Sequence, residues 1–203
     1  MVLVWPFLPA AAGNGRTGQI TGAVWLNGKK QPVSNAVVYL GGVRPAPRTN
    51  APPAVLDQQQ NEFVPRVQLA RGGTPLIIQN SDPHLHVLRV ELLQGGAAAR
   101  PLWRIATPYA GYEQRWTLPA MDEAFLLRAC GENGHERMIA YVAVMPHPWA
   151  ALTDAQGRYQ IADVPVGEHR LYAWHETLGT LAGRVRVARG RASEVHFDFP
   201  HAP

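Results

Sequence analysis

Four side chains of the types that bind soft metal ions occur at a spacing that could bring them to one ion. Cys130, His135 and Met138 follow one another in the order Cys-x4-His-x2-Met, and His86 lies far upstream. Two imidazoles, a thiolate and a thioether suit copper in both oxidation states, because sulfur favours Cu(I) and imidazole favours Cu(II). Two His and one Cys around copper, with a weak axial Met, are typical of electron-transfer sites. The sequence therefore predicts a copper site made by these four residues.

The elements that must position these side chains are short strands. The ligands Cys130, His135 and Met138 span a loop between strands expected at 124–129 and 138–145. Gly131 and Gly134 allow this loop the tight path that brings three side chains to one ion. The fourth ligand is expected on a strand at 85–92, which alternates apolar and polar residues along its length.

Two histidines, His84 and His86, lie close enough together to compete for the fourth position. Asn80 to Pro83 reads as a turn by composition, and His84 follows it directly. His86 falls on the apolar face of the expected strand, where a dry site belongs. We therefore expect His86 to be the ligand and His84 to be a turn residue. His147 and His175 are expected to be hydrogen-bonded structural residues, although they could form a second polar site.

The rest of the chain predicts an all-β protein. The 19 Gly and 18 Pro residues are spread among short apolar or alternating runs, and no segment of ten or more residues has helical periodicity. Asn27-Gly28 between two such runs is a hairpin signal. Strands are expected at 19–26, 37–40, 63–69, 76–79, 85–92, 114–118, 124–129, 138–145, 169–174, 183–188 and 194–199.

Composition excludes several classes of protein. With 203 residues, 46% hydrophobic and 17% charged, the chain can bury a core and is not disordered. No apolar run approaches the roughly 20 residues of a transmembrane helix. The net charge is +4 and the Arg residues are scattered, which argues against a nucleic-acid partner. The single Cys cannot form an internal disulfide. The apolar start and the small residues after it predict a signal remnant at 1–17, and hence export, and a disordered arm is the alternative.

The two ends of the chain resemble one known family. GQITGAVWLNGKKQPVSNAVVYL at 18–40 and LTDAQGRYQIADVPVGEHRLYAW at 152–174 are similar to successive parts of a carboxypeptidase-regulatory-like (transthyretin-like) β-sandwich. We therefore expect residues 18–49 and 148–200 to form one domain, with residues 50–147 inserted in it as a second. One continuous larger sandwich is the alternative.

The chain also resembles, over about residues 18–190, the cupredoxins, in particular the methylamine-utilisation or plastocyanin-like type. The resemblance is carried by Asn80-Ser81-Asp82-Pro83 with His86, by Cys130 with His135, Met138 and Tyr141, and by His147-Pro148 and Trp174-His175-Glu176. It implies a Greek-key β-sandwich that binds copper. Two features depart from that group, because the Cys-to-His gap is four residues here instead of two, and Val87 stands where Asn usually follows the first ligand.

The function expected from these observations is that of a periplasmic or secreted one-copper electron carrier. Such a protein is not an enzyme by itself, because four protein ligands leave no open position for a substrate. Its partner would be a redox protein, such as a cytochrome or a larger redox complex. Two alternatives stay open: a structural or interaction module without redox work, and a copper storage or delivery protein.

Overall fold

The structure is a computed structural model, and in the residues that it describes the regular secondary structure consists of β-strands. These residues are 16–29, 31–44, 51–93, 99–132 and 134–200, so the expected N-terminal arm lies almost wholly outside them. The described residues contain 18 strands and no helix, and thus no helix that could span a membrane. The all-β prediction is confirmed.

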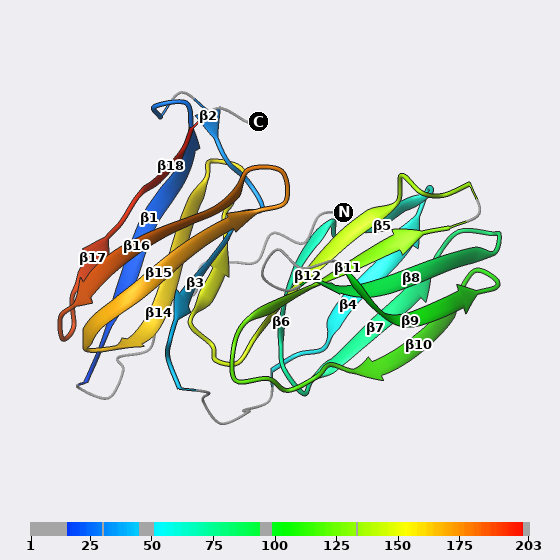
Figure 1. Cartoon of the computed structure of the whole chain (residues 1–203), viewed down its shortest axis with the longest axis horizontal. Helices are drawn as coiled ribbons and strands as arrows, with labels where there is room; N and C mark the ends of the chain where they lie inside the picture. Colours follow the sequence, from blue (N-terminus) through cyan, green and yellow to red (C-terminus); the bar gives the residue numbers. More distant parts are fainter. Residues whose placement is uncertain (1–15, 30, 45–50, 94–98, 133, 201–203) are drawn as a thin grey trace. The chain divides into compact units, whose positions relative to one another are not determined.

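The chain divides into two compact units. One unit combines Met1–Leu40 with Ala151–Pro203, and the other is the continuous segment Gly41–Ala150. Figure 1 shows this connectivity, since the blue strand β1 (Thr17–Leu26) lies among the yellow to red strands of the C-terminal part. The domain boundaries expected from the sequence were 49/50 and 147/148. The families expected for the two parts stay predictions.

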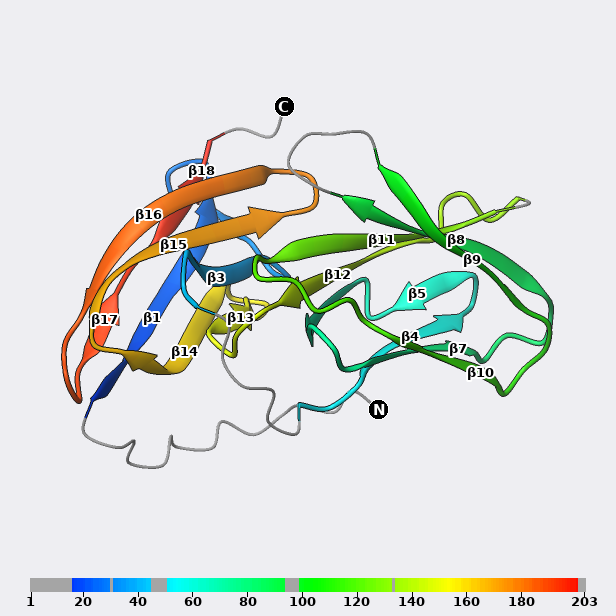
Figure 2. The ribbon, with the colours of Figure 1, turned by 60° about the horizontal axis from the view of Figure 1, so that its bottom comes forward.

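The unit Gly41–Ala150 is a sandwich of two sheets, which Figure 2 shows as separate layers. The five-stranded sheet has the order β6 (Val67–Arg71), β12 (Ile139–Met145), β11 (Phe125–Gly131), β8 (His86–Leu93) and β9 (Arg100–Thr107). The four-stranded sheet has the order β10 (Tyr112–Thr117), β7 (Pro75–Asn80), β4 (Ala54–Gln59) and β5 (Glu62–Val64).

Strand alternation explains how these two sheets form one core. Leu88, Val90 and Leu92 on β8 are buried, as are Leu127 and Ala129 on β11, and all five belong to one apolar cluster. Residues of β4 and β7 in the opposite sheet join the same cluster. Because successive side chains point to opposite faces, the intervening residues of β8 and β11 face outward.

The other unit also contains two sheets. In one, β1 (Thr17–Leu26) pairs with β14 (Arg158–Pro165), β17 (Ala192–Glu194), β18 (Phe197–Phe199) and the short β2 (Gln31–Pro32). The second has the order β13 (Ala150–Leu152), β3 (Val37–Gly41), β15 (Gly167–His175) and β16 (Gly179–Val187). The expected hairpin turn is present at Asn27-Gly28, where both residues have positive φ angles of 59° and 68°.

The outward face of the five-stranded sheet in Gly41–Ala150 carries an ion-pair network around Glu91. This carboxylate is only 7% exposed and accepts hydrogen bonds from Arg128 at 2.6 Å and Arg89 at 2.6 Å. Burial raises the pKa of Glu91, but the two guanidinium groups outweigh burial, so that its pKa lies below the ordinary value. Glu91 therefore stabilises the fold while it is ionised.

Replacing Glu91 with Gln should lower the free energy of unfolding at pH 7 by roughly 1–2 kcal/mol, because both ion pairs are lost and an amide offers one acceptor oxygen where the carboxylate offers two. A carboxyl group whose pKa is lowered by folding stabilises the folded state at pH values above its unfolded pKa. This stabilisation is lost as the pH falls through the pKa of the folded state. The difference between the two proteins should therefore shrink as the pH is lowered from 7 towards 3. Urea unfolding of metal-free protein at pH 7 and at pH 3 measures this difference, and an equal difference at the two pH values would contradict the expectation.

Candidate metal centre

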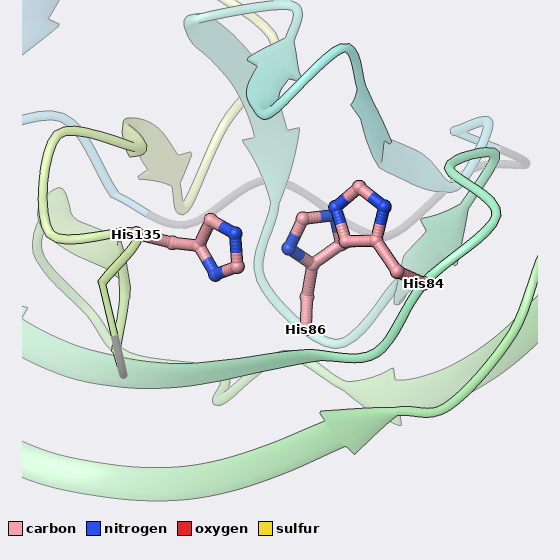
Figure 3. A group of neighbouring side chains, drawn as sticks. All are labelled: His84, His86 and His135. Carbon is pink, nitrogen blue, oxygen red and sulfur yellow. The ribbon is translucent and has the colours of Figure 1, made fainter.

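Three histidines from two loops and a strand converge at one end of the Gly41–Ala150 sandwich. His86 is the first residue of β8, His84 precedes it by two residues, and His135 lies in the loop between β11 and β12. One ring nitrogen from each lies within 4.8 Å of the others. The ring centroids are 4.6 Å apart for His86 and His135, and 4.7 Å apart for His84 and His86 (Figure 3).

His86 is the buried member of this group, and its two ring nitrogens differ sharply in their surroundings. Its side chain is 1% exposed, and its Nε2 lies 2.8 Å from a carboxylate oxygen of Asp82. Its Nδ1 is buried without a hydrogen-bond partner in the structure. In Figure 3 this nitrogen is the one next to the ring carbon that is bonded to Cβ, and it lies on the side of the ring that faces His135.

The contact with Asp82 determines which tautomer His86 adopts. A carboxylate only accepts hydrogen bonds, so the Nε2 of His86 must donate its proton to Asp82. The other nitrogen, Nδ1, then carries a lone pair. Burial lowers the pKa of His86 more than the contact with Asp82 raises it, which keeps the ring neutral. A neutral imidazole whose second N–H is held by a carboxylate is the arrangement that metal-binding histidines use.

Asp82 is itself held in place by the backbone. Its two carboxylate oxygens accept hydrogen bonds from the backbone N–H groups of Gln60 at 2.6 Å and Asn61 at 3.0 Å. Burial raises the pKa of Asp82, but these hydrogen bonds and the one from His86 outweigh burial, so its pKa is lowered. Gln60 and Asn61 both have positive φ angles, in the tight turn between β4 and β5. The turn thus directs two N–H groups at the carboxylate that orients His86.

Asn80, at the end of β7, fixes the backbone on both sides of the site. Its side-chain amide donates to the carbonyl oxygen of His84 at 2.9 Å and to that of Thr107 at 2.8 Å. The Oδ1 of the same side chain accepts a hydrogen bond from the backbone N–H of Asp82 at 2.9 Å. One buried side chain therefore ties His84 and Asp82 to the strand that pairs with His86.

The loop that carries His135 closes through its backbone. The N–H of Gly131 donates to the carbonyl of Met138 at 2.9 Å, and the N–H of Met138 donates to the carbonyl of His135 at 2.9 Å. A Cβ at Gly131 would overlap the carbonyl oxygen of His135, and Gly134 has a φ of 94°. These two glycines thus allow the tight path that the sequence indicates.

Cys130 does not join the three histidines. It lies within β11, where Ala129 faces the core, so its side chain points to the opposite, outward face together with Arg128. It pairs with Arg89 of β8, while His86 points inward from that strand. Burial raises the pKa of the Cys130 thiol, which disfavours the thiolate that metals bind.

Of the four predicted ligands, the structure brings together His86 and His135. Met138 is 2% exposed and belongs to the apolar cluster of the sandwich. His84, which the sequence indicated as a turn residue, lies in the group of converging rings although its side chain is exposed. Asp82 was not singled out as a functional residue either. The spacing Asp-x3-His was the signal that could have suggested the contact between Asp82 and His86 across the turn.

The three imidazoles fit a metal ion with nitrogen ligands. Metal–nitrogen bonds of about 2.0–2.1 Å place ligand nitrogens roughly 3.5 Å apart, so separations within 4.8 Å need only small side-chain movements. The buried lone pair of His86 also lacks any other partner in the structure. Imidazole donors suit copper, zinc, nickel and iron. Among the described residues that offer His, Cys, Asp or Glu ligands, this is the one group of three or more that converges.

Comparisons with known proteins give a partial likeness. No protein-family model matches the sequence, and no curated protein matches it. Similar solved structures include an amicyanin variant (14% identity, TM-score 0.34, 45% of this chain and 80% of that chain). Others are a purple cupredoxin from Nitrosopumilus maritimus (13%, 0.34, 45% and 98%) and auracyanin from Roseiflexus castenholzii (10%, 0.35, 46% and 97%). At these TM-scores the likeness describes about half of this chain and transfers no property to it.

Proposed function

We propose that this protein binds one copper ion through His84, His86 and His135 and transfers electrons outside the cytoplasm, in the periplasm or after secretion. The observation that carries the proposal is the buried, unpartnered Nδ1 of His86. It faces a second imidazole and is kept free of a proton by the Asp82 contact on the other side of the ring. When bound, copper supplies a one-electron couple between its two oxidation states.

The residues of the proposed site have different roles in binding copper. His86 is the buried anchor, held on a strand that pairs on both sides. His135 is half-buried and His84 exposed, so the ring cluster reaches the protein surface. Asp82 and Asn80 hold the backbone and the ring of His86 in one arrangement. Because these contacts hold His86 in place, this ligand needs little reorganisation between two charge states, which favours electron transfer.

The surface beside the exposed ligand offers a redox partner an apolar contact. Leu85, which lies between His84 and His86, is 52% exposed, and Tyr109 is 60% exposed. The loop that contains Tyr109 is joined to the site, because the N–H of Gly111 donates to the carbonyl of Asn80 at 2.7 Å. We expect a redox protein to dock at this end of the sandwich.

Copper delivery is the second candidate function, and the position of Cys130 favours it. With that thiol on the outward face of the sheet, the converging ligands contain no thiolate to retain Cu(I). Exposed His84 would then be the ligand that exchanges with a receiving protein. Reversible one-electron voltammetry of the copper-loaded protein supports electron transfer, whereas loss of copper on reduction supports delivery.

Copper titration followed by optical and electron paramagnetic resonance spectroscopy tests the binding site. We expect one Cu(II) per chain, with nitrogen hyperfine structure and no intense thiolate-to-copper band. Replacing Cys130 with Ser should leave stoichiometry and spectrum unchanged. An intense visible band that disappears in the Cys130→Ser protein would show that the thiol is a ligand and that the histidine-only site is wrong.

A further inference from the structure

The outward face of the β15–β16 pair, in the unit formed by both chain ends, carries two arginines directly opposite each other. Arg170 of β15 is the cross-strand partner of Arg184 of β16, and both side chains are exposed. Opposed residues in an antiparallel pair have Cβ atoms about 5 Å apart, and like charges at that separation destabilise the pair. This arrangement works against the fold unless an anion offsets it.

Neither guanidinium has a partner in the described residues. No hydrogen bond or ion pair joins Arg170 or Arg184 to another group, although most arginines on the other sheets contact a carboxylate or a carbonyl. Glu168, two residues before Arg170 on the same face of β15, opposes Arg186 instead. The two arginines are therefore left with ten N–H donors to offer to a ligand.

A shallow hollow adjoins this arginine pair. It measures about 310 Å³ and is lined by Arg170, Tyr172, Ala182, Gly183 and Arg184. The small side chain of Ala182, the cross-strand partner of Tyr172, leaves open space beside the ring of Tyr172. That ring is held in place by stacking on Tyr39, with centroids 5.4 Å apart and an interplanar angle of 26°.

The same arginines also line a second hollow further along the strands. It measures about 460 Å³ and includes Glu168 and Arg186. Arg170 and Arg184 thus lie between two adjoining depressions that follow the strands. An extended ligand could occupy both depressions and place an anionic group at the arginines that they share.

We propose that this face binds an acidic glycan, a chain of sugar rings that carry carboxylates. The guanidinium groups would hold a carboxylate through paired hydrogen bonds, and the fixed ring of Tyr172 would pack against the face of a sugar ring. An acidic protein partner fits less well. Neither hollow offers such a partner a large exposed apolar anchor, because Val64, Leu85, Tyr109 and Val166, the large exposed apolar residues of the described chain, line neither of them.

Binding of polygalacturonate to the full-length protein, measured by isothermal titration calorimetry at low salt, tests the proposal. Neutral dextran and poly-glutamate are the comparison polymers. The variant Arg170→Gln/Arg184→Gln should bind polygalacturonate at least tenfold more weakly, with an unchanged circular dichroism spectrum. Arg189→Gln, which removes an exposed arginine of the same unit outside both hollows, should bind like the wild type.

Three outcomes would overturn the proposal. One is that the wild type does not bind polygalacturonate, and a second is that the double variant binds it as well as the wild type does. The third is equal binding of poly-glutamate, which would assign the face to acidic protein segments. Tyr172→Leu adds an independent check, because loss of ring packing should weaken polygalacturonate binding and leave any poly-glutamate binding unchanged.

Discussion

Replacing His86 with alanine is expected to abolish copper binding at micromolar concentrations. His86 is the buried member of the histidine group, and its unpartnered Nδ1 is the strongest indication of a ligand in the described structure. Removing the group that hydrogen-bonds to a metal ligand already lowers metal affinity by about 10–100-fold, and removing the ligand itself should lower it further. We therefore expect a decrease of well over 100-fold.

The His86→Ala experiment needs two companion variants. His84→Ala should weaken binding by roughly tenfold, because its exposed position lets water replace the imidazole. His169→Ala removes a histidine of the other unit, whose ring contacts the carbonyl of Pro165 at 2.7 Å, and should leave copper binding unchanged. Copper affinity is measured by competition with a chelator of known affinity. Wild-type affinity in the His86→Ala protein would refute the site.

How far the sequence could predict this site depended on strand parity. Alternation along β8 correctly assigned His86 to the inward face with Leu88 and Val90. The same rule, applied along β11 from the buried Leu127 and Ala129, puts Cys130 outward. The sequence interpretation instead placed Cys130 in a loop, where parity does not apply. The strand continues two residues beyond its expected end at Ala129, through Cys130 and Gly131, which explains the difference.

The contacts around Asp82 could not be predicted from spacing. They depend on the β4–β5 turn, in which Gln60 and Asn61 direct their N–H groups at a carboxylate more than 20 residues away. Such contacts form only when β4 and β7 pair in a definite register, with Gln58 opposite Asn80. No local pattern at residues 80–86 contains that register.

Most expected strands are present, and the differences have local causes. The run 63–69 is two strands, β5 and β6, because Pro65 has no N–H to give to a ladder. The run 194–199 divides into β17 and β18 because the ladder with β1 is interrupted at Ala23, whose N–H donates to the ring of His196. The strand β9 was not predicted, since it contains Pro101 and its sequence lacks a clear alternation of apolar and polar residues.

Replacing Asp82 with Asn is expected to weaken copper binding by about 10–100-fold without removing a ligand. An asparagine has one acceptor oxygen, whereas Asp82 accepts from Gln60, Asn61 and His86 with two. If the backbone donors retain that oxygen, the side-chain NH2 faces His86. The Nε2 of His86 must then accept a hydrogen bond, and its proton moves to Nδ1, which removes the lone pair from the metal site.

The tautomer of His86 in the metal-free protein is therefore the decisive measurement for Asp82→Asn. Long-range 1H–15N correlation spectra should show the proton on Nε2 in the wild type and on Nδ1 in the variant. Glu136→Gln is the matched control, because it removes one negative charge beside His135, where Glu136 accepts the N–H of Gly134 at 3.0 Å. That variant should keep the tautomer of His86 and nearly wild-type copper affinity. If Asp82→Asn weakened copper binding while His86 kept its proton on Nε2, Asp82 would act through its charge or through the fold of the turn, and its orienting role would be wrong.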